Sequence, residues 1–126
     1  VAFEGDTGPY LCYAHARIRS ILRRVDGDLS REVTNFTFAE PAARALALGV
    51  LGFPEALTAT LNTTQPHRLC TYLFDLAQRF TSFYEACPVV TSEGAIRAER
   101  LTLCVATARV LEIGLSLLGV RAPERM

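Results

Sequence analysis

The chain has 126 residues and 50% of them are hydrophobic, which is enough apolar material for one core but too little chain for two full domains. Thirteen basic residues balance thirteen acidic ones, and this formal net charge of zero argues against a protein whose whole surface attracts phosphate. The longest apolar stretch, residues 101–118, is interrupted by polar and charged side chains, so no membrane-spanning helix is expected. We therefore treat residues 1–126 as a single domain.

Caps, breakers and apolar spacing predict five helices, each of which opens near a capping residue or a proline and stops at glycine, proline or polar turn residues. Their expected ranges are Pro9–Val25, Pro41–Gly49, Phe53–Leu61, Pro66–Cys87 and Gly94–Leu118. Gly49 and Gly52 are expected to end the second helix, and Gly119 to cap the fifth.

The fourth expected helix is apolar on two sides, which predicts that other helices cover it from two directions. Its two stripes are Leu69, Leu73, Leu76, Phe80, Phe83 and Cys87, and beside them Cys70, Phe74, Ala77 and Tyr84. The fifth helix has two apolar lines as well, and short connections favour antiparallel neighbours. We predict an all-α fold, an antiparallel helical bundle of about five helices with the two long C-terminal helices at its centre.

The first helix carries rings and guanidiniums beside its apolar line. The apolar line is Leu11, Ala14, Ile18, Leu22 and Val25, and the second line, one residue earlier except at Ser20, is Tyr10, Tyr13, Arg17, Ser20 and Arg24. One residue is a rotation of about 100° around a helix, so the second line is expected at the edge of solvent. Exposed rings and Arg suit unpaired RNA bases and phosphates, but boundary Tyr residues that merely cover a core would give the same pattern.

The cysteines and acidic residues give weaker indications. The four cysteines lie in apolar or helical runs, which is typical of reduced thiols in a cytoplasmic protein. Cys12 and His15, with His67 and Cys70, have the spacing of two half zinc sites, although buried Cys and lone His usually have structural roles. The acidic residues of the last two helices, including Glu99, are spaced like solvated surface charges. No catalytic residue and no metal ligand is predicted.

Three segments of the chain, together with Phe80–Tyr84, resemble the C-terminal anticodon-binding (DALR) domain of arginyl-tRNA synthetase, a class I aminoacyl-tRNA synthetase. The segments are Phe3–Arg17, Pro66–Ala77 and Leu118–Met126. The resemblance implies a fragment from the C-terminal end of a longer synthetase. It also implies that the residues around the splayed anticodon loop of arginine tRNA are Tyr10, Tyr13, Arg17, Tyr84 and Met126. The family more often has Gln at the position of Cys12.

The resemblance further implies which cofactors and partners the domain has and that it lacks ligase activity by itself. ATP and Mg would be bound by the catalytic domain of the same parent chain, so the fragment is expected to need no cofactor and to be inactive as a ligase. Arginine tRNA and that catalytic domain are the implied partners, without DNA or a membrane. A helical protein-protein interaction module, with Tyr10, Tyr13 and Arg17 buried against another protein, is the alternative that the residues leave open.

Overall fold

Five helical segments fill most of the chain in the computed structural model, which describes residues 7–25 and 36–119. They are α1 (Thr7–Arg24), α2 (Pro41–Leu51), α3 (Phe53–Thr63), α4 (Pro66–Ala86) and α5 (Gly94–Leu117). These bounds lie close to the predicted ones, and the described part of the chain contains no strand. The predicted all-α fold is therefore confirmed.

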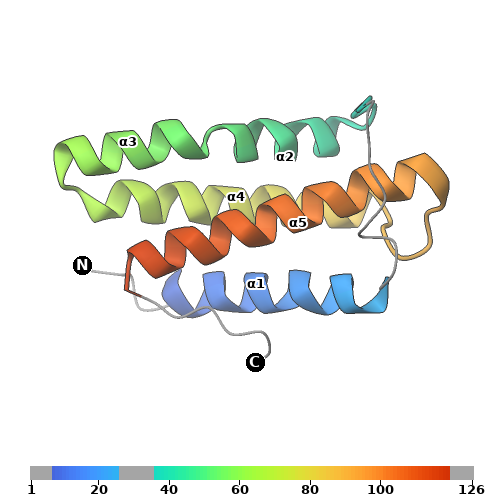
Figure 1. Cartoon of the computed structure of the whole chain (residues 1–126), viewed down its shortest axis with the longest axis horizontal. Coiled ribbons are helices and arrows are strands. Elements are labelled where there is room, and N and C mark those ends of the chain that lie inside the picture. Colours follow the sequence, from blue (N-terminus) through green and yellow to red (C-terminus); the bar gives the residue numbers. More distant parts are fainter. Residues whose placement is uncertain (1–6, 26–35, 120–126) are drawn as a thin grey trace.

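α2 and α3 follow each other almost without interruption along one side of the bundle (Figure 1), and we call Pro41–Thr63 the α2–α3 rod although its direction changes between the two helices. With this rod counted as one helix, the predicted count of five is one too high for the described residues. Gly52, between α2 and α3, keeps near-helical dihedral angles of φ −78° and ψ −5°. Gly49 does not stop α2 as predicted. It lies inside the helix, where a Cβ would meet Arg79 Cδ at 3.0 Å and Leu76 Cδ1 at 3.1 Å, so it permits close packing on α4.

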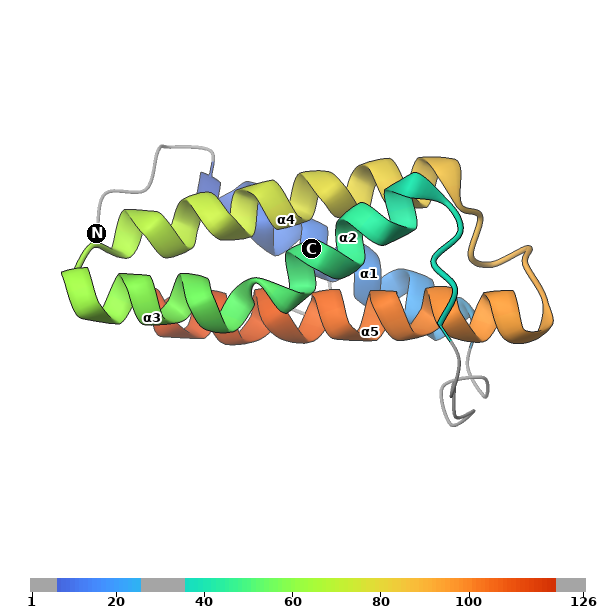
Figure 2. The same cartoon turned by 90° about the horizontal axis from the view of Figure 1, so that it is seen from above.

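α4 and α5 occupy the centre of the bundle, as predicted. The α2–α3 rod packs along α4, while α1 lies on the opposite side against α5 and α4 (Figures 1 and 2). α1 is antiparallel to α5, since α1 begins at the end of the bundle where α5 finishes (Figure 1), and His15 of α1 approaches Glu112 of α5. The helices that short connections join, α3 with α4 and α4 with α5, are antiparallel as expected. Two contacting pairs that are not joined directly run parallel (Figure 1): α2 with α5, and α1 with α4, where Tyr10 meets Phe74 and Arg17 meets Tyr84.

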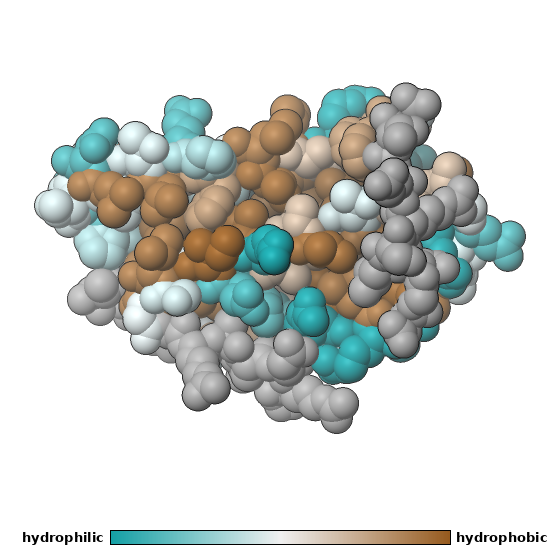
Figure 3. Space-filling view, viewed as in Figure 1, coloured by the Kyte–Doolittle hydropathy of each residue, from teal (hydrophilic) through white to brown (hydrophobic). Residues whose placement is uncertain are grey.

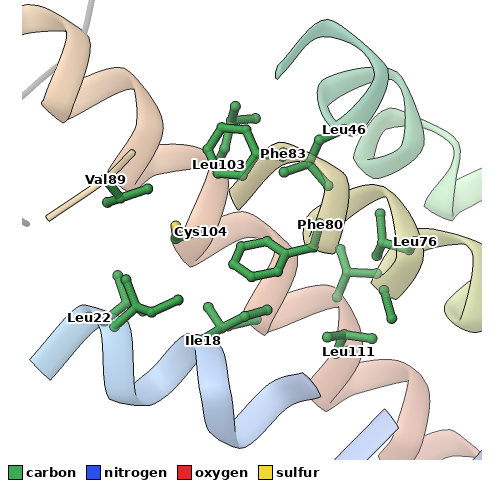
Figure 4. Packing of buried hydrophobic residues seen from close by; sticks show 14 of the residues in the cluster. Ile18, Leu22, Leu46, Leu76, Phe80, Phe83, Val89, Leu103, Cys104 and Leu111 are labelled. Carbon is green, nitrogen blue, oxygen red and sulfur yellow. The ribbon is translucent and has the colours of Figure 1, made fainter. Parts of the chain in front are cut away.

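The core lies where α1, α2, α4 and α5 converge. Phe80 and Phe83 of α4 are its largest buried side chains, and Ile18, Leu46 and Leu111 reach it from the other three helices (Figure 4). α5 approaches α4 closely at Gly114, where a Cβ would lie only 2.7 Å from both Cδ atoms of Leu73.

Glu99 is buried at 8% exposure, so the expectation that it is a solvated surface charge is wrong. Its carboxylate accepts backbone hydrogen bonds from Thr37 N at 2.7 Å and Phe38 N at 3.3 Å. These bonds satisfy the buried charge and hold the segment before α2 against α5.

One segment is apolar enough to cross a membrane by length and composition. This is the α2–α3 rod, Pro41–Thr63, with a mean hydropathy of 1.2. Such a helix is weak evidence for a span, since core helices pass the same test, and this rod packs on α4 through buried Leu46 and Gly49. Few residues of the rod are fully buried, only 11% of the apolar window, and the others are partly buried or exposed.

Candidate nucleic-acid interface

α1 presents the predicted stripe of rings and guanidiniums at its solvent edge. Leu11 and Ile18 are fully buried in the core, whereas Tyr13 is 60% exposed and Arg17 is exposed. Tyr10 is half-buried. The rotation of one residue from the apolar line therefore places the stripe where the sequence indicated.

Tyr10 packs against a ring that sequence reasoning did not select. The ring of Phe74 on α4 lies with its centroid 5.1 Å from that of Tyr10, at an angle of 45°. Phe74 is 36% exposed, so the pair forms an aromatic surface open to solvent. The sequence feature that could have pointed to Phe74 is its position on the second apolar stripe of α4, which also contains Cys70 and Tyr84.

Arg17 lies over the ring of Tyr84, with its guanidinium carbon 5.2 Å from the ring centroid. Tyr84 also stacks with Phe80 of the core, at 6.0 Å between centroids and 11° between planes. The core therefore fixes the orientation of the Tyr84 ring, and the cation is attracted to the ring's π-electrons. A base that stacks on this face must move Arg17 aside or lie on its guanidinium.

The two contacts belong to one surface, because α1 and α4 are parallel. Tyr10 and Arg17 are seven residues apart on α1, which separates them by about 10 Å along the helix. We call these five residues the aromatic-arginine surface: Tyr10, Tyr13, Arg17, Phe74 and Tyr84. It offers stacking faces for more than one base, with a cation beside them. Met126 lies outside the described residues.

Cys12 is not part of this surface. Its side chain is 8% exposed and belongs to the core cluster, and burial raises the pKa of its thiol. The departure from the family's more frequent Gln therefore falls on the side of α1 that faces the core. All four cysteines are free in the structure, and Cys12, Cys87 and Cys104 are buried.

The two half zinc sites do not come together. His15 is buried with Nε2 3.9 Å from the Glu112 carboxylate, while His67 is exposed on α4. In residues 7–25 and 36–119 no group of three or more His, Cys, Asp or Glu could hold a metal ion. His15 and Arg19 instead line a pocket of about 260 Å³ between α1 and α5, so the basic residues of α1 divide between two sides of the helix.

Comparison with known proteins identifies the fold. The model of the DALR anticodon binding domain matches residues 11–126. The chain belongs to this family. Four of the five residues of the aromatic-arginine surface lie within the matched range. The fifth, Tyr10, directly precedes it.

The domain is similar over its whole length to arginine-tRNA ligases. The ligase of Frankia casuarinae is 54% identical over 126 residues, which is 100% of this chain and 21% of the relative. That of Thermobifida fusca is 53% identical over 127 residues, covering 100% of this chain and 22% of the relative. The domain thus spans about a fifth of the length of these curated relatives.

Solved structures agree. The arginyl-tRNA synthetase of Thermus thermophilus superposes with a TM-score of 0.87 at 42% identity, covering 99% of this chain and 22% of that one. The enzyme of Plasmodium falciparum gives a TM-score of 0.78 at 29% identity, over 98% of this chain and 22% of that one. The all-α fold is that of the matching part of these enzymes.

Proposed function

We propose that the chain is the non-catalytic, tRNA-binding module of an arginine-tRNA ligase and that it binds the anticodon loop of arginine tRNA on the aromatic-arginine surface. One observation carries the proposal: two ring contacts, Tyr10 with Phe74 and Arg17 with Tyr84, are arranged side by side and partly open to solvent in an anticodon-binding family. Membership of that family favours RNA binding over the alternative that these Tyr and Arg side chains merely cover the edge of the core.

Each residue of the surface has a role that its position supports. Tyr13 is the most exposed ring and the freest to stack on a base. Tyr10 is backed by Phe74, so its orientation is fixed before RNA arrives. Arg17 binds a base edge or a phosphate once it leaves the Tyr84 ring. Met126 would add an apolar contact or its terminal carboxylate.

The activity of the parent protein is part of the same proposal. Formation of arginyl-tRNA would take place on the remainder of a longer polypeptide, where ATP and Mg are bound, and the present chain alone would have no ligase activity. The cytoplasm is the proposed location. DNA and membranes are not proposed partners.

A change of the middle anticodon base tests the proposal. All arginine anticodons have cytosine at that position, so a site that identifies arginine tRNA should discriminate there. We expect weaker binding of an arginine tRNA transcript with uracil at the middle position than of the unaltered transcript, measured by filter binding. A transcript with one stem base pair inverted far from the loop is the control and should bind normally. Equal affinity for all three transcripts would refute the proposal.

A further inference from the structure

A pocket between α1 and α5 lies apart from the aromatic-arginine surface, which α1 and α4 form. We call it the α1–α5 pocket; its volume is about 260 Å³ and its lining residues are His15, Arg19, Val105, Ala108, Arg109 and Glu112. Ala108 is buried and His15 is only 1% exposed, so both lie on the inner side of the pocket. Figure 3 shows hydrophilic side chains gathered over the region where α1 and α5 lie side by side.

The charged groups of the α1–α5 pocket are two guanidiniums and one carboxylate. Arg19 is half-buried, whereas Arg109 and Glu112 are exposed. With His15 neutral, the pocket has one positive charge in excess. Within residues 7–25 and 36–119 the Arg109 guanidinium takes part in no hydrogen bond or ion pair. The Glu112 carboxylate lies 3.9 Å from His15 Nε2, which is too far for a hydrogen bond, so both exposed groups can bind a ligand.

These groups suit a ligand with a phosphate and, beside it, a hydrogen-bond donor. Arginine side chains bind a phosphate through charge-assisted hydrogen bonds. A carboxylate only accepts hydrogen bonds and repels a phosphate, so Glu112 needs a donor from the ligand. An internal RNA nucleotide has such a donor in its ribose 2′-hydroxyl. The pocket is smaller than most drug-sized sites, which begin at about 300 Å³, and its size suits a single ribose-phosphate unit.

One RNA can contact the α1–α5 pocket and the aromatic-arginine surface together, because α1 contributes to both. Arg17 and Arg19 are two residues apart, a rotation of about 200°, so they lie on opposite sides of the helix. A helix with its side chains is about 10–12 Å across, a distance that a single RNA hairpin spans. The pocket is therefore within reach of nucleotides near those that stack on the aromatic-arginine surface.

We propose that the α1–α5 pocket binds one ribose-phosphate unit of the tRNA, away from the middle anticodon base. Arg19 and Arg109 hold its phosphate, and its 2′-hydroxyl donates a hydrogen bond to Glu112. This inference rests on the proposed function, since its ligand is part of the tRNA that the aromatic-arginine surface binds. Inorganic phosphate shares only the anionic part of this chemistry and would leave the Glu112 carboxylate beside an anion.

Deoxyribose substitution tests the hydroxyl contact. Each ribose of an arginine-tRNA anticodon stem-loop is replaced in turn, and binding to the 126-residue chain is measured by fluorescence anisotropy. At one position outside the middle base we expect about tenfold weaker binding, as for loss of a hydrogen bond to a charged group. Glu112→Ala should bind the all-ribose stem-loop about tenfold more weakly and lose nothing further at that position. If no costly position couples to Glu112 in this way, the inference is overturned.

The sign of the Glu112→Ala effect separates this contact from general charge attraction. Removal of a carboxylate makes the chain more positive and by itself strengthens RNA binding. Glu55→Ala is the matched control, because Glu55 is an exposed carboxylate on α3 and does not line the pocket. This control should bind the stem-loop as well as the unaltered chain or slightly better. Tighter binding by a folded Glu112→Ala variant would contradict the inference.

Replacement of Arg109 tests the phosphate contact. Arg109→Gln should weaken binding of the stem-loop and make the slope of log K against log salt shallower by about 0.7, the contribution of one phosphate on a single strand. Arg44→Gln, at an exposed position of α2 outside the pocket, should leave the slope unchanged. Equal slopes for both variants would remove the phosphate from the pocket and refute the inference.

Inorganic phosphate is the probe for the other source of the anion. At constant ionic strength, millimolar phosphate should displace the stem-loop no more than chloride does. Displacement by phosphate that Arg109→Gln abolishes would assign the pocket to free phosphate and overturn the inference.

Discrimination of the middle anticodon base keeps the two proposals apart. Glu112→Ala and Arg109→Gln should both retain it, because the pocket binds a different nucleotide. Retained discrimination without any deoxyribose position that couples to Glu112 would refute this inference alone. Loss of discrimination in the unaltered chain would refute the proposed function.

Discussion

The Arg17 guanidinium over the Tyr84 ring is the contact that most constrains how RNA can bind. Because Tyr84 is held by Phe80, its ring direction is set by the core, whereas Arg17 is exposed and able to move. The sequence pattern predicted the exposure of Tyr13 and Arg17, since this follows from helical rotation alone. The sequence pattern could not predict that Phe74 contacts Tyr10 or that the Glu99 carboxylate accepts hydrogen bonds from two backbone N–H groups. Both contacts join segments that are distant in the chain.

Replacement of Tyr84 by alanine tests the residue-level assignment. We expect Tyr84→Ala to weaken binding of arginine tRNA by about 1 to 3 kcal/mol, the usual contribution of a base stacked on an aromatic side chain. Tyr84→Phe retains the ring and should bind nearly as well as the unaltered protein, provided that circular dichroism shows the same helix content in both. Unchanged affinity of a folded Tyr84→Ala variant would remove Tyr84 from the site.

At the level of helices, the parallel course of α1 and α4 creates the aromatic-arginine surface. Helix limits were predictable from Pro and Gly punctuation and from apolar spacing, and the central place of α4 followed from its two apolar stripes. Relative direction was not predictable, because short connections constrain only helices that follow one another, and α1 is separated from α4 by the α2–α3 rod. Gly49 was wrongly predicted to end α2, because glycine commonly ends a helix and the sequence does not show that this one packs against Arg79 and Leu76 of α4.

The close approach of α4 and α5 predicts the effect of adding one methyl group. Gly114→Ala places a Cβ 2.7 Å from both Leu73 Cδ atoms, and we expect a loss of about 1 to 3 kcal/mol in the free energy of unfolding, as for other overpacked cores. Urea denaturation measures the change. Ser116→Ala, at an exposed position of the same helix, is the control and should be nearly neutral. Equal stability of both variants would show that α5 can shift without cost.

The contact between α2 and α4 predicts a dependence of stability on pH. Tyr72 Oη donates a hydrogen bond to the Gly49 carbonyl at 2.6 Å, and burial raises the pKa of Tyr72 to about 12 from its ordinary value of 10.0. The folded state therefore favours the neutral phenol, so its contribution is complete below pH 10.0 and declines as the pH rises toward 12.

Tyr72→Phe should be less stable than the unaltered protein at neutral pH, because the hydrogen bond is lost, and its stability should fall less steeply at alkaline pH. Urea denaturation at a series of pH values up to about 11 measures both effects. Both proteins contain Cys104, whose thiol pKa burial raises to about 12, so both should lose some stability from it at alkaline pH. The difference in slope between the two proteins therefore measures the contribution of Tyr72. Identical slopes would rule out the Tyr72 contribution.

For the molecule as a whole, the neutral net charge limits how strongly salt can affect RNA binding. Exposed arginines on α1, among them Arg17 and Arg24, give a local rather than a general attraction for phosphate. We expect the logarithm of the association constant to fall with the logarithm of the salt concentration with a slope between about −1 and −3, since each phosphate neutralised on a single strand contributes about −0.7.

Fluorescence anisotropy with a labelled anticodon stem-loop between low and moderate salt gives this slope. Arg17→Gln should make it shallower if Arg17 binds a phosphate, and should leave it unchanged if Arg17 binds a base edge. A slope near zero for the unaltered protein would favour the alternative of a protein-protein interaction module, whose apolar contacts release few ions.

The covered Tyr84 ring has a consequence for the speed of binding. Rotamer changes of exposed side chains take picoseconds to nanoseconds, which is far shorter than the interval between productive encounters of two macromolecules. Arg17 can therefore leave and return many times before a tRNA arrives. A stacking face that is occupied in the free protein is thus no barrier to association, and the time a tRNA stays bound, rather than its rate of capture, is where Arg17 should exert its effect.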